Sequence, residues 1–450
     1  MKRIFVVVLF SAFVVGLNAQ NATQSKILTF EDAIKIALKN GMLLNQQRNN
    51  LEYNKMLKTS AIAGLGPSIS GTVQAYQTNG NSFIQQQGVV NGTVDAFNAF
   101  LNANINLFNG FSQINRIKQA DNALDAQLYF VNRTAQDIIN TVATQYLAVL
   151  LNKELLRIAQ ENYNAQDKLL LQIQEQVKLG ARSPVDEYNQ LSQTKAAQLR
   201  MLQAEVNQVN DRALLAQTLL IDSFEELELV RPSSWDINEM TSKELELHNL
   251  YETALKQRGD YQRAEKNEMA AKYNMEVNRA LMLPTLSAFA SYGSAYNKKQ
   301  GDNTALSFND QFKVVNVRKQ YGLQLSIPIF GGFQNRTTYV QQRVNYLNSK
   351  ATLRNAEVLV KTDVYRAYQN FELYKKTYAV TLDQQKAAEV ANEYEVERYN
   401  LGVTNFVDYA NANRVLVQAQ TDKAQAEYRL LFQKILVDYA VGTLKPEDMQ

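Results

Sequence analysis

Apolar and polar residues alternate along two separate stretches of the chain. The first stretch has apolar residues at Leu101, Ala103, Ile105 and Leu107 with asparagines between them, and the second has them at Leu323, Leu325, Ile327 and Ile329. A period of two is typical of a β-strand that is apolar on one face and wet on the other. The pattern predicts strands at 99–108 and 320–330, preceded by companion strands at 68–77 and 285–296. Soluble β-sandwiches alternate in the same way, so this pattern alone leaves the class of protein open.

A very long helical pattern follows each second strand. Neither Gly nor Pro occurs between Phe111 and Leu179 or between Phe333 and Leu401. Along the first run, apolar residues recur every seven positions, as in the seam of a coiled coil. These positions are Val142, Val149, Leu156, Tyr163, Leu170 and Val177, and those of the second run are Val364, Phe371, Tyr378, Gln385, Asn392 and Tyr399. We expect helices over 112–178 and 334–400, each about 100 Å long at about 1.5 Å per residue.

The two halves of the chain repeat one another. Phe108 and Phe330, Gly180 and Gly402, and Asp186 and Asp408 are each 222 positions apart, the difference between 330 and 108. Such self-similarity predicts an internal tandem duplication. The expected organisation is a first repeat at 20–221, a connector at 222–250, a second repeat at 251–442 and a C-terminal tail at 443–450. Shorter helical stretches are expected at 31–63, 185–221, 251–281 and 405–440.

The N-terminal residues have the pattern of an export signal. Lys2 and Arg3 precede an apolar run from Ile4 to Val15, and small residues then lead to Ala19, the expected last residue of a signal peptide over 1–19. Further along, no apolar stretch reaches the about 18 residues that a membrane-spanning helix needs. Any crossing of a membrane is therefore expected to be made by strands.

The amino-acid composition excludes many classes of functional site. The chain has no Cys and a single His, His248, which excludes disulfides, thiolate nucleophiles, Cys/His metal sites and His-based triads. We therefore expect no enzyme activity and no cofactor or metal site. The formal net charge of +3 leaves no basic excess for nucleic acid.

The predicted strands are too few to form a closed wall by themselves. About eight strands are needed to fill a barrel, and an open sheet in lipid would leave backbone groups unpaired. Three copies would supply twelve strands, within the range of outer-membrane barrels. In that barrel the alternating apolar residues would face lipid and the amides a water-filled lumen. Aromatic residues at the strand-to-helix borders would mark the interface with the membrane, namely Phe108, Phe111, Phe330 and Phe333.

The order and spacing of these features resemble the TolC family of outer membrane efflux proteins. The resemblance runs from about residue 28 to 442 and is carried by the duplicated unit, the entry "LTFEDAIKIALKNG" and the tips "LGARSPVDEYNQ" and "LGVTNFVDYANA". It implies a mixed α+β membrane protein, a homotrimeric 12-stranded β-barrel with four strands per chain, continued by a long α-helical coiled-coil barrel in the periplasm. Gly259 departs from the family, where Pro is frequent, and is expected to alter only a helix start.

The family implies a passive exit duct in the outer membrane. An inner-membrane transporter and a periplasmic adaptor protein would deliver substrates to the trimeric, gated tunnel of a tripartite efflux pump. Type I protein secretion and metal efflux are alternative duties of such a duct. A coiled-coil scaffold of the cell envelope without a pore is an alternative of another class, which would have no need of the alternating strands.

The resemblance also gives roles to the two helix tips. Leu179, Gly180, Leu401 and Gly402 would form the turns on which the adaptor docks. Asp408 would form a carboxylate ring that narrows the periplasmic entrance, and Tyr399 would hold Asp186 to keep the entrance closed. Three further positions complete the expected gate: Thr404 stands where relatives have an Arg, Arg182 holds the equivalent place in the first repeat, and Asn411 replaces a second Asp. As an alternative, an Asp early in a helix often serves only as a cap.

Overall fold

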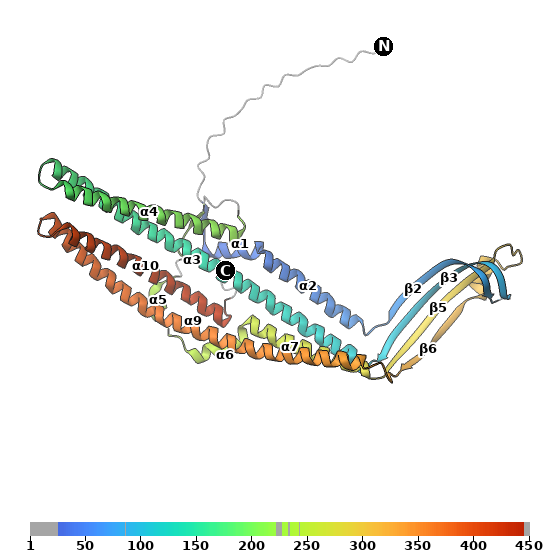
Figure 1. Cartoon of the computed structure of the whole chain (residues 1–450). Helices are drawn as coiled ribbons and strands as arrows, with labels where there is room; N and C mark the ends of the chain where they lie inside the picture. The colour runs from blue at the N-terminus through green and yellow to red at the C-terminus, as the bar shows by residue number, and fades with distance from the viewer. Residues whose placement is uncertain (1–25, 86, 222–226, 233–234, 243, 445–450) are drawn as a thin grey trace, which may run out of the picture. The chain divides into compact units, whose positions relative to one another are not determined.

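The structure is a computed structural model that describes residues 26–85, 87–221, 227–232, 235–242 and 244–444 (Figure 1). The expected signal peptide, 1–19, lies outside the described residues, and the tail is described only to Leu444. The chain forms two compact units. The first unit contains Met1–Ile36 and Thr144–Trp235, and the second contains Ala37–Ala143 and Asp236–Gln450.

Four strands of the second unit form one antiparallel sheet in the order β2-β3-β5-β6. Their bounds are β2 (Ser68–Ile84), β3 (Gly88–Phe108), β5 (Thr285–Lys299) and β6 (Arg318–Ser326). Each repeat supplies two neighbouring strands, which Figure 1 shows side by side. The second unit therefore contains strands of both repeats, so the two compact units are not the two sequence repeats.

The first two strands are longer than the sequence predicted. The stretch between the two predicted strands, 78–98, is rich in Gly and Asn, but most of it continues the ladder, with Gly80 opposite Gly92 and Asn81 opposite Asn91. Residues of this composition favour turns when nothing opposes them. Here Ile84 and Val94 are buried, so packing of the hairpin overrides the local preference.

The last strand is shorter than predicted. β6 ends at Ser326, which pairs with Thr285, so Ile327 and Ile329 are not strand residues, and the prediction that they continue the apolar face is wrong. Pro328 explains the end of the strand, because it has no N–H to donate to a ladder and restricts the residue before it.

Two long helix hairpins follow the strands. The long helices coincide with the expected ranges, and their bounds and those of the return helices are α3 (Ser112–Lys178), α4 (Pro184–Leu219), α9 (Gln334–Asn400) and α10 (Phe406–Val441). Every residue of the two predicted seven-residue series is buried or half-buried. No helix in the part of the chain that the structure describes combines the length and apolar character needed to cross a membrane.

The remaining elements are short or interrupted. They are α1 (Phe30–Asn40), α2 (Met42–Ala63), α5 (Ile237–Ser242), α6 (Leu247–Gln257), α7 (Gly259–Arg279), the 3₁₀ turn η1 (Ala280–Met282), α8 (Phe308–Asp310) and the π turn η2 (Gln311–Val315). The ranges 31–63 and 251–281 thus each hold a break. Arg258 makes the second break with an extended backbone, φ −77° and ψ 115°.

The core of the second unit lies where α9 and α10 run side by side (Figure 1). Val360, Val364 and Phe371 of α9 pack with Leu430 and Val437 of α10 in one buried cluster. Burial of each such side chain contributes about 1.5–3 kcal/mol. The hairpin is therefore fixed by its seam and not by helix propensity alone.

In the first unit a buried tyrosine joins two short parallel strands, β1 (Lys26–Leu28) and β4 (Leu227–Leu229). The Tyr146 hydroxyl lies 2.8 Å from the Leu28 carbonyl oxygen and 2.7 Å from that of Val230. Burial raises the pKa of Tyr146 to about 12. Its ring contacts Phe30 and Trp235 edge-on. The sequence did not predict these strands, since three residues are too few for a periodic signal.

Candidate functional site

The two helix tips have nearly the same backbone geometry. Gly180 and Gly402 both have φ of 71°, a left-handed conformation that favours glycine. In the first tip the Ala181 N–H donates to the Gln176 carbonyl over 2.8 Å, and in the second the Val403 N–H donates to the Arg398 carbonyl over 2.9 Å. Both are Schellman endings, which satisfy the last carbonyls of a helix.

The tips expose apolar side chains. Leu179 is 82% exposed and Leu401 72%. Val185, Tyr188 and Val407, at the starts of the return helices, are also exposed. Such side chains mark a binding surface where they form one contiguous patch, whereas single exposed apolar residues are common on proteins.

Only the second tip is backed by a cluster of aromatic rings. Tyr399 is buried and stacks on Tyr409 with ring centroids 5.0 Å apart, and Phe406 lies 6.2 Å from Tyr399. The residues 222 positions earlier are Val177, Pro184 and Glu187. Periodicity does not predict this cluster, although a comparison of the two repeats position by position shows that its aromatic residues occur in the second repeat alone.

Asn405 caps α10, and Asp408 binds this cap. The Asp408 backbone N–H donates to Asn405 Oδ1 over 2.9 Å, and its carboxylate accepts from Asn405 Nδ2 at 2.9 Å. Thr404 Oγ1 lies 3.3 Å from the same carboxylate oxygen. The cap and the third helical residue thus hold each other, with the Asn405 side-chain amide in place of the backbone N–H that a capping box uses. The carboxylate is nevertheless exposed, so capping leaves it able to face solvent.

The other expected gate residues lie on both tips. Asn411 is exposed and accepts a hydrogen bond from Arg414 over 2.8 Å. Asp186 and Arg182 are half-buried at the start of α4, where Ser183 is the cap. Asp186 belongs to the first unit and Tyr399 to the second. The contact between these two residues stays a prediction.

The strand register confirms one apolar and one polar face. Ala103 lies opposite Ile69 and Ala290, whereas its neighbour Asn102 lies opposite Ser70 and Ser291. Directly opposite residues share a face. The further predicted apolar residues Leu101, Ile105, Leu323 and Leu325 lie on the face of Ala103, opposite Tyr292, Ala288, Ala288 and Leu286 respectively. At the predicted residue Leu107 the register shifts, and Phe108 takes the place opposite Leu286. Ser291 Oγ donates to Asn102 Oδ1 over 2.8 Å on the polar face.

Two phenylalanines cover glycines on the polar face. Phe100 lies over Gly293, where an added Cβ would be 2.3 Å from its ring, and Phe289 lies over Gly322, at 2.9 Å. Both pairs are directly opposite in the ladder. The rings therefore fit only because glycine leaves room for them.

Each strand-to-helix border holds an edge-on pair of phenylalanines. The ring centroids of Phe108 and Phe111 are 5.6 Å apart, and those of Phe330 and Phe333 are 5.8 Å apart. Phe111 and Phe333 have φ of 64° and 61°. Each long helix begins at the residue after this left-handed phenylalanine. Residues 109–111 separate β3 from α3, whereas the longer segment 327–333 separates β6 from α9.

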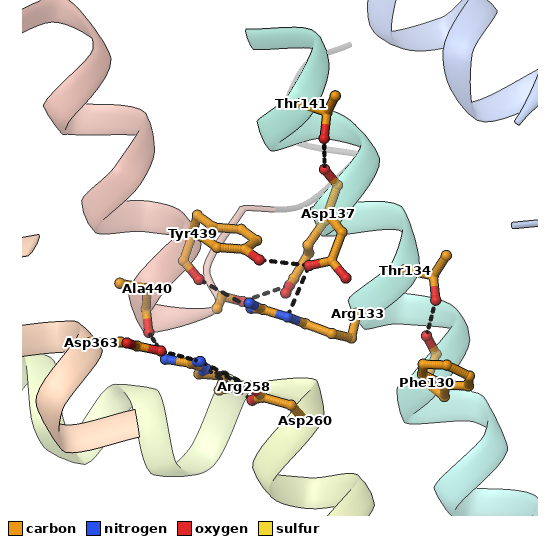
Figure 2. A network of polar contacts seen from close by, with 12 residues as sticks. Phe130, Arg133, Thr134, Asp137, Thr141, Arg258, Asp260, Asp363, Tyr439 and Ala440 are labelled. Carbon is orange, nitrogen blue, oxygen red and sulfur yellow. Dashed lines mark hydrogen bonds and ion pairs between the residues drawn. The ribbon is translucent and has the colours of Figure 1, made fainter. Parts of the chain in front are cut away.

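A network of arginines and acids fixes the end of α10 (Figure 2). Arg258, with a side chain only 5% exposed, binds Asp260 at 2.9 Å and Asp363 at 2.7 Å and donates to the Ala440 carbonyl over 3.3 Å. Burial alone would raise the pKa of Asp363, but hydrogen bonds and charges from Arg258 and Arg366 outweigh it and hold this pKa below its usual value. Arginines beside the last carbonyls also complement the helix dipole.

A second arginine completes the same network. Arg133 lies over the Tyr439 ring at 4.0 Å and binds Asp137 at 3.1 Å. The Tyr439 hydroxyl donates to Asp137 over 2.7 Å (Figure 2). Burial and this hydrogen bond raise the pKa of Tyr439 to about 12. This network has no signal in the sequence, because its members lie far apart along the chain.

Gly259 does more than start a helix. α7 begins there as expected, but an added Cβ would lie 2.8 Å from the Tyr129 carbonyl oxygen and 3.4 Å from Arg133 Cβ. Glycine thus lets α7 begin against the backbone of α3. In the described ranges, no group of His, Asp or Glu side chains is arranged to hold a metal ion.

Comparison with known proteins decides the family. The family model described as "Outer membrane efflux protein" matches residues 33–219 and 250–443. The chain belongs to this family. The matched ranges contain the helix tips and the four-stranded sheet, and they place the protein in the outer membrane with its helices extending into the periplasm.

Individual relatives are distant. Outer membrane protein TolC of Escherichia coli is 24% identical over 168 residues, which cover 37% of this chain and 34% of that protein. Outer membrane efflux protein BepC of Brucella suis is 20% identical over 94% of this chain and 87% of its own length. The match to E. coli TolC thus spans about a third of that relative.

Solved structures show the same fold over nearly the whole chain. The outer membrane protein VceC of Vibrio cholerae superposes with a TM-score of 0.80 at 14% identity and covers 92% of this chain and 96% of its own. CusC superposes with a TM-score of 0.79 at 15% identity and covers 95% of both chains. The mixed fold of long helices and a four-stranded sheet is therefore that of outer membrane efflux channels.

Proposed function

We propose that this protein is the outer membrane exit duct of a tripartite efflux pump, assembled from three copies. The observation that carries the proposal is the sheet, which has one apolar face, one polar face and two edge strands, β2 and β6. Unpaired edges are not tolerated in lipid, and four strands are fewer than the about eight that close a barrel. Pairing of β6 with β2 of a neighbouring copy would remove every edge.

The size of the apolar face supports a membrane crossing. It extends along β3 from Phe97 to Ile105, a length at the lower end of the about 9–11 residues of a tilted strand in a bilayer. It ends at Asp95, which accepts a hydrogen bond from Gln77 over 2.8 Å. In the trimer, the face that bears Ala103 contacts lipid and the asparagine face lines the water-filled lumen.

The exposed tips are the proposed contacts with a periplasmic adaptor. Leu179, Gly180, Leu401 and Gly402 form this surface in each copy. The adaptor in turn joins the duct to an inner-membrane transporter, which supplies the energy. The duct itself conducts passively, and Asp408, Asp186 and Tyr399, together with Thr404, Asn411 and Arg182, form its gate.

Assembly and conductance test this proposal. The full chain, purified in detergent, is expected to contain three copies per particle by native mass spectrometry and to produce steady single-channel currents in a planar lipid bilayer. A monomer that stays soluble after detergent removal and conducts no ions would overturn it and would favour an envelope scaffold.

Protein secretion is a second candidate function of the duct. The alkaline protease secretion protein AprF of Pseudomonas aeruginosa is 25% identical over 186 residues, or 40% of this chain. The pyoverdine export outer membrane protein OpmQ of the same species is 24% identical over 78% of this chain. Accumulation of a fluorescent dye in cells with and without the gene separates the two duties, because loss of a dedicated secretion duct leaves dye levels unchanged.

A further inference from the structure

The second tip carries charges of both signs on one side of α10. Asp408, Asn411 and Arg414 follow one another at three-residue spacing and are all exposed. Residues three apart are neighbours on a helix surface. The guanidinium of Arg414 donates to Asn411 Oδ1 over 2.8 Å, so it extends along the helix toward the turn that bears Asp408.

Both charges are anchored to α10 itself. Asn405 and Thr404 hold the Asp408 carboxylate at the helix start, and Asn411 holds Arg414. The two residues are six positions apart, a rise of about 9 Å along the helix axis at about 1.5 Å per residue. This separation is close to the Debye length of about 8 Å at physiological ionic strength. An ion passing this side of the helix would therefore experience both charges together.

Arg414 has no counterpart at the equivalent position of the first repeat. The residues 222 positions before Asp408, Asn411 and Arg414 are Asp186, Asn189 and Ser192. The acid and the amide are thus duplicated, whereas the arginine is not. The first tip carries its arginine at Arg182, before α4, and not within the first turns of the return helix.

We propose that Arg414 is a selectivity-determining residue of the periplasmic mouth. The inference rests on the proposed function, because only a trimer converts one arginine into a ring. Three guanidinium groups, one turn or two further along the tunnel than the Asp408 carboxylates, would offset the electric field of the carboxylate ring. A carboxylate ring alone favours cations, whereas a mouth with both rings admits anionic solutes as well.

Ion selectivity tests this assignment. The wild-type protein and its variants are reconstituted in planar bilayers, and the K⁺/Cl⁻ permeability ratio is measured from the reversal potential in a KCl gradient. Arg414→Gln is expected to raise the ratio at least about twofold, since it leaves the carboxylate ring unopposed. Asp408→Asn is expected to lower the ratio, and Arg414→Lys, which keeps the charge, to leave it near the wild-type value.

Arg398→Gln provides the matched control. Arg398 is also close to the second tip, but it belongs to α9 and is paired with Glu395 at 2.9 Å. An Arg414→Gln channel with the wild-type ratio, or an equal shift in Arg398→Gln, would overturn the assignment while leaving the exit duct in place. Absence of any current from the wild-type protein would instead overturn the proposed function and this inference with it.

Discussion

At the scale of single residues, the end of α10 shows how closely two helices approach. Gly442 follows α10 with φ of 82°, and an added Cβ would lie 2.8 Å from Arg258 Cα. Position 442 therefore requires glycine both because its φ is positive and because a side chain would collide with Arg258. Position 402 requires glycine only because its φ is positive, since no atom lies within 4 Å of an added Cβ.

This contrast predicts unequal effects of the same substitution. Gly402→Ala is expected to cost about 1–2 kcal/mol from the left-handed conformation. Gly442→Ala is expected to cost about 1–3 kcal/mol more, because backbone atoms must move. Melting temperatures followed by circular dichroism in detergent compare the two variants, and a smaller decrease for Gly442→Ala would contradict the observed contact.

The arginine network predicts a dependence of stability on pH. The pKa of Asp363 is held below its ordinary value of 3.8, so its contribution to folding is present above that value and is lost as the pH falls through the lower pKa of the folded state. The melting temperature of the wild-type protein should therefore fall as the solution is acidified below about pH 4. Asp363→Asn should be less stable at pH 7 and show a weaker decrease. Equal acid sensitivity of both proteins would argue against this role.

At the scale of elements, the sheet shows which local preferences tertiary contacts overrule. Alternation predicted the first part of β2, the last part of β3 and most of β5 and β6. It failed at residues 78–84 and 88–98, where Gly and Asn favour turns but pairing between β2 and β3 continues. It failed also after Ser326. Apolar residues still alternate there, at Ile327 and Ile329, but Pro328 has no N–H to donate and the strand ends.

The phenylalanine over Gly293 predicts an assembly defect. Gly293→Val would push against the Phe100 ring and the Ala99 carbonyl oxygen, which lie 2.3 Å and 2.5 Å from an added Cβ. Overpacking of this kind costs about 1–3 kcal/mol. We expect less trimer on unheated electrophoresis gels of outer membrane extracts. Gly71→Val is the matched control, since no atom lies within 4 Å of a Cβ at Gly71 on the same sheet, and an equal loss in both variants would refute the steric explanation.

At the scale of the whole molecule, the proposed gate links residues of both units. Asp186 and Tyr399 are expected to restrain the mouth of the assembled duct. Asp186→Ala should therefore raise single-channel conductance in a planar bilayer, and Tyr399→Phe, which removes only a hydroxyl, should do so too. Glu205→Ala, an exposed acid further along α4, is the control. Conductance that stays at the wild-type value in both gate variants would exclude this restraint.

The sequence by itself determined the periodic and duplicated parts of this protein. The long helices, their seams, the two tips and the alternating strands each follow from side-chain periods that need no knowledge of distant residues. The tertiary structure decided what depends on contacts between distant positions. It set the full length of β2 and β3, the aromatic cluster around Tyr399 and the two arginines that hold the end of α10. A helical or strand period is a local property, whereas a buried ion pair or a ring over a glycine exists only when two remote segments meet.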